Sequence, residues 1–342
     1  MDSAFARQAH ARRTLPTTRY AESTGKLMSA LVSIVIPAYN SADFISNTLD
    51  SCLAQTYPHV EIIVVDDGST DNTVEVVRAY GDKVRLIQQA NQGPAIARNT
   101  GVETAQGEFI QLCDSDDLLL PTKIERCVPL IQNKPEVALA FCQMIPVDEA
   151  GVVVPDTQPY PTEGSGFFSN DDLFCKILRF NGSPIQTSTW LVCKTALQAV
   201  GGLRGDYDLR GTEDWDVLLR LASAYEFVGI PEILVHYRHR SGALTQQPIK
   251  MAKGRLTTIR YARDYEGRTD CFSDSEYDAL EASRYHVLAM TLWHAGDTKG
   301  ARDAFRNAIR IHPPHARMRR VYTWLSYIAP ASVVNRINAI LS

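Results

Sequence analysis

The sequence predicts an α/β protein with a mostly parallel central sheet, followed by an all-helical C-terminal region. Between Leu31 and about Leu120, short segments rich in Val and Ile alternate with helical segments. This alternation is typical of βαβ units, whose parallel strands are covered by helices on both faces. From about Pro248 onward only helical patterns are found. The chain is therefore expected to join a sheet-based domain to a helical extension.

The predicted elements follow from local patterns of apolar residues. The first strand is expected to end at Pro37, and the helix at 212–223 is expected to be capped by Thr212. Ser169 or Asn170 is expected to cap the helix at 169–180. The predicted strands are 31–37, 60–67, 83–89, 107–114, 137–144, 188–194 and 232–238. The predicted helices are 41–55, 69–80, 93–105, 122–132, 169–180 and 212–223.

Composition places the chain among globular proteins that do not bind nucleic acid. The 342 residues are 45% hydrophobic and 22% charged, with a formal net charge of -4. A nucleic-acid-binding protein would normally show a basic stripe or a high pI. No apolar run approaches the about 20 residues of a membrane-spanning helix. We therefore expect a cytoplasmic protein with no nucleic-acid partner, and a peripheral position on the inner face of the membrane stays open.

The seven cysteines are an odd number, and no two form a CxxC pair. Most lie in apolar segments such as ALAFCQM, so we expect reduced core residues of a cytosolic protein. Residues 1–30 contain Arg, Ser and Thr but no apolar core of a secretory signal. They are interpreted as a disordered leader, with Met28 as an alternative natural start.

Residues 246–342 are expected to form the helical extension, and one part of it has a recognisable spacing. In 282–313, Gly296-Asp297, Ala301, Phe305, Ala308 and Pro313 match the turn, packing positions and terminal proline of a tetratricopeptide-like hairpin. A single unit favours a hairpin docked on the preceding domain over a free-standing solenoid, with partner binding as the alternative. The following tail, MRRVYTWLSYIAPASVVNRINAIL, mixes arginines with aromatic residues. It fits a packed terminal helix or a peripheral contact with an anionic membrane.

An acidic turn follows one of the predicted strands. The segment IQLCDSDDLLLP places Asp114, Asp116 and Asp117 directly after a buried run. Carboxylates this close repel one another unless a cation or strong donors share the site. Polar clusters at 37–40 and 66–69 follow two other strands. Because ligands of parallel sheets bind at the carboxyl ends of the strands, the three clusters together predict a polar pocket.

The motifs of two common phosphate sites are absent from the sequence. No GxGxxG follows the first strand, and no GxxxxGK[ST] is present. Acidic loops hold a diphosphate through a hard divalent cation that takes carboxylate and phosphate oxygens together. The DxD spacing of Asp114 and Asp116 suits Mg²⁺ or Mn²⁺. The pattern therefore favours a metal–diphosphate site over a solvated turn.

Three stretches resemble the family 2 glycosyltransferases of GT-A fold. They are VSIVIPAYNSADFISNTLDSCLAQTYPHVEIIVVDDGSTDNT, NQGPAIARNTGVETAQGEFIQLCDSDDLLLP and GTEDWDVLLRLA. The resemblance is specific to about Leu120, patchy to about Thr245 and absent beyond. It implies a GT-A domain at 31–245 and an inverting, EC 2.4 transfer of a sugar from a nucleoside diphosphate, usually a uridine one.

The resemblance also implies roles for individual residues. Pro37, Ala38, Tyr39 and Asn40 would line the base and ribose pocket, and Asp67 would accept a hydrogen bond from the base imide. Asp116 would be the main metal ligand. Asp114 would lie near the ribose or the metal, beside Ser115. Arg98 would approach the nucleotide, with a surface ion pair as the alternative.

The second chemical element is Thr212-Glu213-Asp214-Trp215-Asp216. An inverting transfer needs a general base that deprotonates the acceptor hydroxyl. By resemblance Asp214 is this base and Glu213 orients the acceptor, and the alternative is that both only cap a helix. A helix N-terminus favours the charged form of a carboxylate, so Asp214 is expected to stay ionised near neutral pH. Asp216 is expected to be solvent-exposed.

Basic residues in HYRHRSGALT should balance the charge of the diphosphate. Arg238 is predicted to contact the diphosphate, with a loop salt bridge as the alternative. Family members often carry a histidine shortly after the YR pair, whereas here Arg240 stands near that place and His239 one step away. The HxxH spacing of His236 and His239 lies on a strand end and does not predict zinc.

The QxxRW signature of processive members is missing. We therefore expect a non-processive enzyme that adds one sugar to a saccharide or lipid-linked acceptor of the cell envelope. Two alternatives remain from the sequence. A nucleotidyltransferase would normally carry a Gly-rich basic loop where this chain has PAYNSAD, and a scaffold would bind nucleotide-sugar without turnover.

Overall fold

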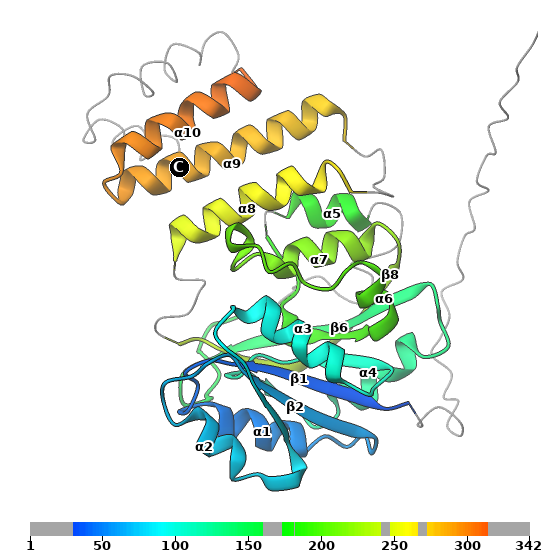
Figure 1. Ribbon diagram of the computed structural model, residues 1–342. Helices are drawn as coiled ribbons and strands as arrows, with labels where there is room; N and C mark the ends of the chain where they lie inside the picture. Colours follow the sequence, from blue (N-terminus) through cyan, green and yellow to red (C-terminus); the bar gives the residue numbers. More distant parts are fainter. Residues whose placement is uncertain (1–29, 160–172, 181, 241–246, 266–271, 314–342) are drawn as a thin grey trace, which may run out of the picture.

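The computed structural model describes residues 30–159, 173–180, 182–240, 247–265 and 272–313. An eight-stranded sheet forms the centre of the molecule, with strand order β3-β2-β1-β4-β7-β6-β8-β5 (Figure 1). The strands are β1 (Val32–Ala38), β2 (Val60–Asp66), β3 (Arg85–Gln88), β4 (Phe109–Leu112), β5 (Leu118–Leu119), β6 (Val137–Val147), β7 (Trp190–Cys193) and β8 (Glu226–Arg238). The predicted mostly parallel α/β sheet is confirmed: β7 and β5 run antiparallel to their neighbours, and the other pairs are parallel.

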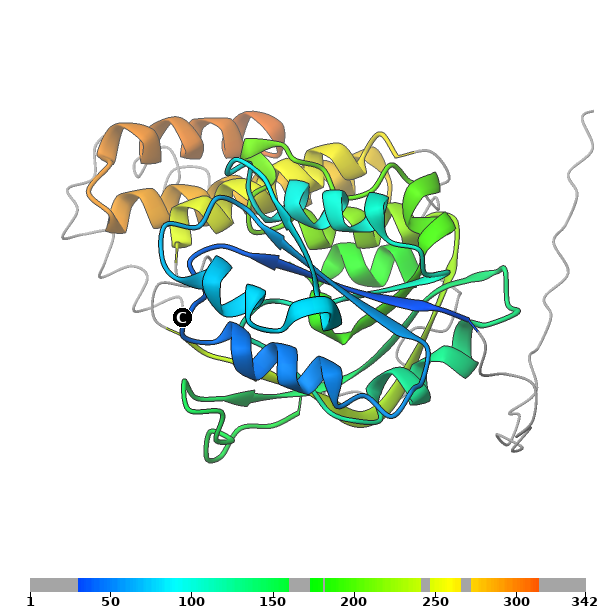
Figure 2. The same cartoon turned by 60° about the horizontal axis from the view of Figure 1, so that its bottom comes forward.

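Helices cover both faces of the sheet (Figure 2). Those of the sheet domain are α1 (Ile45–Leu53), α2 (Thr73–Arg78), α3 (Pro94–Thr104), α4 (Lys123–Ile131), α5 (Leu173–Arg179), α6 (Lys194–Ala199) and α7 (Glu213–Ala222), with 3₁₀ turns η1 (Gly81–Lys83), η2 (Thr187–Thr189) and η3 (Tyr207–Leu209). Side chains of α1, α2 and α4 share one core with Ile34 and Ile36 of β1. Those of α3, α5, α6 and α7 share the other core with Val35. The alternation of buried residues along β1 thus fills both layers.

The register of the parallel strands brings three loops to one edge. β1 pairs with β2 from Val32↔Val60 to Ala38↔Asp66, and with β4 up to Val35↔Leu112. The segments after β1, β2 and β4 therefore leave the sheet side by side, as predicted. The expectation that Pro37 ends the strand is wrong by one residue. Because β4 pairs only as far as Val35, one side of β1 needs no ladder hydrogen bond at Pro37.

Parts of the second half of the sheet were not predicted. β5, α6 and the first six residues of β8 have no clear sequence signal. In β8 the reason is that Gly229 and Pro231 normally weaken a strand. Gly229 is paired with Phe141, and a Cβ at Gly229 would lie 2.4 Å from the ring of Phe141. Packing against a neighbouring ring, which is a tertiary contact, therefore explains this glycine.

We expect Gly101→Ala to destabilise the fold. A Cβ at Gly101 would lie 2.3 Å from Cγ1 of Val35, where α3 crosses β1. Overpacking of a core typically costs about 1–3 kcal/mol. Chemical denaturation would measure the loss. The double variant Gly101→Ala/Val35→Ala frees the space, so its loss should be smaller than the sum of the two single losses. Strict additivity would contradict this steric explanation.

Three helices, α8 (Pro248–Ala262), α9 (Asp274–His294) and α10 (Thr298–Ile311), stack beyond α5 and α7, away from the sheet (Figure 1). Ser273 and Glu276 form a capping box at the start of α9. The turn between α9 and α10 holds Gly296 at φ +85°, and Asp297 accepts a hydrogen bond from the backbone N–H of Gly300. The helical C-terminal region is confirmed as far as residue 313. Its tetratricopeptide-like character stays a prediction.

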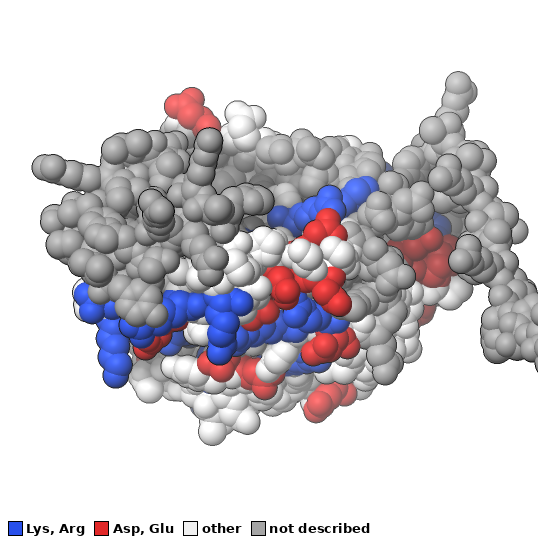
Figure 3. Space-filling model, turned by 90° about the horizontal axis from the view of Figure 1, so that it is seen from above, with Lys and Arg blue, Asp and Glu red and all other residues white. Residues whose placement is uncertain are grey.

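The outward side of this helical region is charged. Figure 3 looks down on it and shows Lys and Arg side chains in a band with acidic side chains beside them. α10 carries Lys299, Arg302, Arg306 and Arg310 at helical spacing, opposite its buried Ala301, Phe305 and Ala308. Within the part of the chain that the structure describes, no helix is long and apolar enough to cross a membrane. The leader, the caps at Ser169 or Asn170 and the aromatic tail lie outside the described residues.

The cysteine prediction holds in part. Cys52, Cys113, Cys127 and Cys142 are buried free thiols, and Cys193 is a half-buried free thiol. Burial raises the pKa of Cys193 to about 11, and it also raises the pKa of Cys127. Cys175 is in a disulfide, so the expectation of a reduced thiol is wrong for that residue.

Candidate active site

A cavity of about 520 Å³ opens at the carboxyl ends of β1, β2 and β4. All twelve residues that the sequence predicted for the site line it. They are Pro37, Ala38, Tyr39, Asn40, Asp67, Arg98, Asp114, Ser115, Asp116, Glu213, Asp214 and Arg238. Residues far apart in the chain thus meet in one polar cavity, whose volume is in the usual range for a small-molecule site.

The loops after β1 and β2 brace each other. Asn40 adopts φ +49°, and its side-chain oxygen accepts hydrogen bonds from the backbone N–H and hydroxyl of Thr70. Tyr39, in contrast, is 47% exposed at the cavity. An aromatic ring on a braced loop offers a firm surface against which a flat ligand group can pack.

Asp67 lines the cavity but already accepts three hydrogen bonds from within the chain. Its Oδ1 accepts from the side chain of Gln89 at 2.8 Å and from the backbone N–H of Gln92 at 2.9 Å. Its Oδ2 accepts from the backbone N–H of Gly93 at 2.8 Å. A carboxylate has about four acceptor positions, so one remains for a ligand. Asp67 also fixes the entry to α3.

The acidic turn divides into buried and cavity-facing residues. Asp117 is fully buried and accepts from the hydroxyl of Ser188 at 2.5 Å and from the backbone N–H of Arg238 at 3.0 Å. Burial and the neighbouring Asp116 raise the pKa of Asp117. Ser115 is turned inward, with its hydroxyl 2.7 Å from that of Ser41. Asp117 therefore anchors the turn, and Asp114 and Asp116 face the cavity.

Each cavity-facing aspartate has an arginine partner. Nη2 of Arg98 lies 2.6 Å from Oδ1 of Asp114, and Nε of Arg240 lies 2.5 Å from Oδ2 of Asp116. The hydroxyl of Thr187 donates to the other oxygen of Asp114 at 3.2 Å. Burial and the charge of Asp114 raise the pKa of Asp116, and Arg240 opposes that rise. The turn thus carries a repulsion that a cation reduces.

The donor set of this turn fits a divalent cation of the Mg²⁺ or Mn²⁺ class. Asp114 and Asp116 offer hard carboxylate oxygens close enough to repel each other. Mg²⁺ typically takes one or two protein carboxylates and completes its shell with phosphate oxygens and water. Among the described residues, no group of three or more His, Cys, Asp or Glu could hold a metal. The described residues therefore suit a cation that arrives with a diphosphate better than a closed all-protein site.

Arg98 joins the acidic turn to α7. It is 6% exposed, and its Nη1 lies 3.3 Å from Oε1 of Glu213. Burial lowers the pKa of Arg98, but the charges of Asp114 and Glu213 outweigh burial and raise it above the ordinary value. Arg98 thus forms the ion pair of the alternative, but in a buried position and not at the surface, and its contact with a nucleotide stays a prediction. Its Nε is buried and has no hydrogen-bond partner among the described residues.

The N-terminus of α7 presents Glu213 and Asp214. Glu213 accepts from the backbone N–H of Gly211 at 2.5 Å, and Asp214 accepts from the backbone N–H of Trp215 at 2.8 Å. Thr212 is the N-cap residue of α7, as predicted, but its hydroxyl donates to the carbonyl of Leu209 and makes no capping hydrogen bond to the helix. Thr212 is turned toward α8, where its Oγ1 lies 3.3 Å from that of Thr258.

Asp214 is not held in its ionised form at neutral pH, contrary to the expectation from the helix terminus. Burial, followed by the charge of Glu213, raises the pKa of Asp214 to about 7. The hydrogen bond from Trp215 and the charge of Arg98 lower it by less. Desolvation and a neighbouring carboxylate outweigh the helix terminus here. A pKa near the working pH is what general acid–base catalysis requires.

Asp216 is fully buried, which corrects the prediction that it is exposed. Its Oδ2 lies 2.6 Å from Nη2 of Arg220, and its Oδ1 lies 3.3 Å from Nη1 of Arg204. The hydroxyl of Tyr265, just after α8, donates to the same Oδ1. Asp216 therefore ties α7 to the helical extension and takes no part in lining the cavity.

Arg238 and Arg240 flank one aromatic ring at the cavity. Their guanidinium carbons lie 5.4 and 5.7 Å from the centroid of Phe44. Nε of Arg238 donates to the carbonyl of Asp116 at 2.8 Å, and its Nη1 donates to that of Glu149. Within the described part of the chain, Nη2 of Arg238 is buried and has no hydrogen-bond partner. The backbone contacts hold Arg238 in place, and Nη2 remains available to an anionic ligand.

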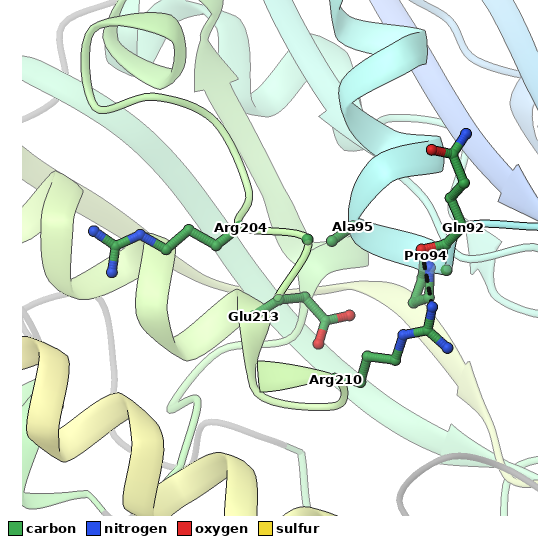
Figure 4. A pocket seen from close by; sticks show the side chains of 8 residues that line it. Gln92, Pro94, Ala95, Arg204, Arg210 and Glu213 are labelled. Carbon is green, nitrogen blue, oxygen red and sulfur yellow. Dashed lines mark hydrogen bonds between the residues drawn. The ribbon is translucent and has the colours of Figure 1, made fainter. Parts of the chain in front are cut away.

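The sequence missed several residues of the cavity. Arg210 donates from Nη2 to the carbonyl of Gln92 at 3.1 Å, and Figure 4 shows Arg210 and Glu213 beside Pro94 and Ala95, while Arg204 points away. Gln247 and Lys250, at the start of α8, also line the cavity. No motif marks these residues. Only the packing of α8 against α7 and η3 brings them there.

An acidic turn and a carboxylate-bearing helix that border one polar cavity of a mostly parallel sheet are the arrangement of a GT-A fold. The family described as Glycosyl transferase family 2 matches residues 33–182. An uncharacterized glycosyltransferase of Rickettsia prowazekii is 30% identical over 226 residues, which cover 64% of this chain and 67% of that protein. The chain belongs to glycosyltransferase family 2.

Other proteins extend the comparison. An uncharacterized glycosyltransferase of Rickettsia typhi is 33% identical over 207 residues, which cover 58% of this chain but only 61% of that protein. Residues 1–349 of S. aureus TarS, solved with UDP-GlcNAc, are 17% identical with a TM-score of 0.63, over 86% of this chain and 87% of that chain. A mannosyltransferase from Pyrobaculum calidifontis, solved with GDP-Man and Mn²⁺, is 19% identical with a TM-score of 0.54, over 90% and 87% of the two chains. At these identities the two structures share the fold.

Proposed function

We propose that the protein is an inverting, divalent-metal-dependent glycosyltransferase. It moves one sugar from a nucleoside diphosphate donor, UDP-linked in our proposal, to a hydroxyl of an acceptor. The observation that carries the proposal is that the acidic turn and Asp214 border the same cavity. A donor held at the turn and an acceptor activated by Asp214 then meet in one enclosed space.

The donor nucleotide is assigned to the loops after β1 and β2. The exposed ring of Tyr39 offers a stacking surface, and the remaining acceptor position of Asp67 is assigned to the base imide. TarS was solved with UDP-GlcNAc, and the mannosyltransferase with GDP-Man. Both structures share this fold and support a nucleotide-sugar in the cavity. The choice of a uridine donor rests on the resemblance to the family.

The diphosphate is assigned to the acidic turn and the arginines beside it. When bound, Mg²⁺ or Mn²⁺ would be held by Asp114 and Asp116 and would stabilise the negative charge that grows on the leaving diphosphate. The mannosyltransferase solved with Mn²⁺ supports a metal in this fold. Nε of Arg98 and Nη2 of Arg238, which have no hydrogen-bond partner among the residues that the structure describes, are assigned as further donors for phosphate oxygens.

Asp214 is assigned as the general base. In an inverting transfer the base takes the proton from the acceptor hydroxyl as its oxygen attacks the anomeric carbon opposite the diphosphate. A pKa of about 7 matches Asp214 to this task near neutral pH. Glu213, held by Arg98 and the backbone of Gly211, keeps this turn of α7 in place and is assigned to orient the acceptor.

The acceptor is assigned to the side of the cavity bordered by α7 and α8. We divide the chain into a catalytic domain at 31–245 and a helical extension from 246, with a tetratricopeptide-like hairpin at about 282–313. Because Gln247 and Lys250 line the cavity, the extension takes part in acceptor binding as well as in support. A saccharide or lipid-linked acceptor of the cell envelope is the substrate class that we propose.

Calorimetric titration of UDP, with and without Mn²⁺, tests the donor assignment. Wild type should bind UDP more tightly with Mn²⁺, and Asp116→Ala should lose most of that gain. Asp82→Asn, on the exposed turn η1, serves as the control and should bind like wild type. If GDP or a thymidine diphosphate binds in place of UDP, only the base assignment changes. If no nucleoside diphosphate binds under any metal condition, the proposed function is wrong.

A further inference from the structure

Arg240 lies beside Asp116, in the position where a metal ion bound to Asp116 would lie. Its Nε lies 2.5 Å from Oδ2 of Asp116, and the two side chains are 28% and 15% exposed. At this distance and exposure the attraction between the opposite charges is substantial. The positive charge beside Asp116 thus comes from the chain itself.

The same oxygen cannot serve both cations fully. A divalent ion of this class bonds a carboxylate oxygen at about 2.0–2.1 Å and brings its own shell of oxygen ligands. A guanidinium paired with that oxygen is repelled by the ion and occupies part of the space for the shell. Binding of a metal at Asp116 therefore requires that Arg240 give up this contact.

A nearby anion can receive the released guanidinium. Arg240 and Arg238 flank the ring of Phe44 at 5.7 and 5.4 Å, and both line the cavity. Arginine binds phosphate oxygens in a bidentate manner and remains charged in proteins. Backbone carbonyls hold Arg238 in position, whereas Arg240 is ion-paired with the carboxylate that the metal needs.

We propose that Arg240 is an exchange cation, which neutralises Asp116 in the metal-free protein and moves to the donor diphosphate when a divalent metal takes Asp116. This inference rests on the proposed function, because it assumes a diphosphate in the cavity. It predicts that metal and nucleoside diphosphate favour each other's binding, since only the two together satisfy both Asp116 and Arg240. Such coupling between two ligands is typically about 5- to 150-fold.

The test is the affinity for Mn²⁺, measured by the electron paramagnetic resonance signal of free Mn²⁺, with and without UDP. Without UDP, Arg240→Ala and Arg240→Gln should bind Mn²⁺ at least about fivefold more tightly than wild type, the lower end of the usual coupling range. With saturating Mn²⁺, the same variants should bind UDP more weakly than wild type. Opposite changes for the two ligands cannot arise from a general loss of structure.

Arg126→Ala provides the matched control, because Arg126 pairs with a carboxylate, Glu232, at an exposed position. It should leave both affinities unchanged. If the Arg240 variants bind Mn²⁺ no more tightly than wild type, or if wild type binds Mn²⁺ neither alone nor with UDP, the exchange is wrong. If Mn²⁺ binds as expected but UDP never binds, the proposed function fails separately, and the competition at Asp116 still stands.

Discussion

Asp214→Asn is expected to lower the transfer rate by about 10²- to 10⁴-fold, the usual contribution of a general base. Asparagine keeps the size of the side chain but cannot take a proton from the acceptor hydroxyl. The affinity for UDP should stay close to that of wild type, because the proposed nucleotide contacts lie on the loops after β1 and β2, whereas Asp214 lies on α7. UDP release from a panel of UDP-sugars with a crude acceptor fraction measures the rate, and calorimetry measures the affinity.

The pH dependence supplies a second readout of the same residue. The base form of Asp214 is the carboxylate, and its pKa is raised to about 7 by burial and by Glu213. Transfer should therefore rise as the pH increases through about 7 and fall below it. Glu213→Gln removes one of the two raising causes, so this limb should move to lower pH. A rate that is flat from pH 5 to 8 would contradict the assignment of Asp214 as the base.

Asp216→Ala is expected to produce a large loss of stability. Asp216 is fully buried and compensates the charge of Arg220, which is itself 8% exposed. Removing one partner of a buried ion pair typically costs about 3–5 kcal/mol, because the other charge is left uncompensated. The variant also removes the acceptor for Arg204 and Tyr265. Against a total stability of about 5–15 kcal/mol, this loss would be visible as a lower midpoint in chemical denaturation.

Asp303→Ala is the matched control for this prediction. Asp303 pairs with Arg306 across one turn of α10, where the side chains are 55% and 46% exposed. Exposed pairs contribute at most about 1 kcal/mol, so the variant should unfold almost like wild type. Equal losses for the two variants would mean that Asp216 does not anchor α7 to the extension.

Local sequence patterns were sufficient to predict the first half of the sheet. Strands β1 and β2 are runs rich in Val and Ile that are mostly buried, and β3 and β4 are shorter, partly apolar segments separated from them by helices. β7 and the last part of β8 were also visible, as short apolar runs. β5 was not visible because its two residues are too few to show a period. The start of β8 was not visible because Gly229 and Pro231 interrupt its apolar pattern.

The candidate site divides in the same way. The twelve residues were found because each lies in a short motif at a strand end or a helix start, and the parallel register then brought these motifs together. Arg210 and Lys250 belong to no motif. Lys250 reaches the cavity through the packing of α8 against α7 and η3, and Arg210 is held there by the carbonyl of Gln92. Asp216 resembles Asp214 in sequence context, but one residue faces the cavity and the other a buried arginine.

The sequence by itself determined the α/β class, the edge of the sheet where ligands bind and the types of side chain that gather there. These properties depend on the period of apolar residues and on short motifs, both of which are local. Only the tertiary structure decided the charge state of Asp214, the partners of Asp116 and Asp216, and the part that the helical extension plays in the cavity. Burial and charge neighbours set these properties, and both depend on segments that are distant in the chain.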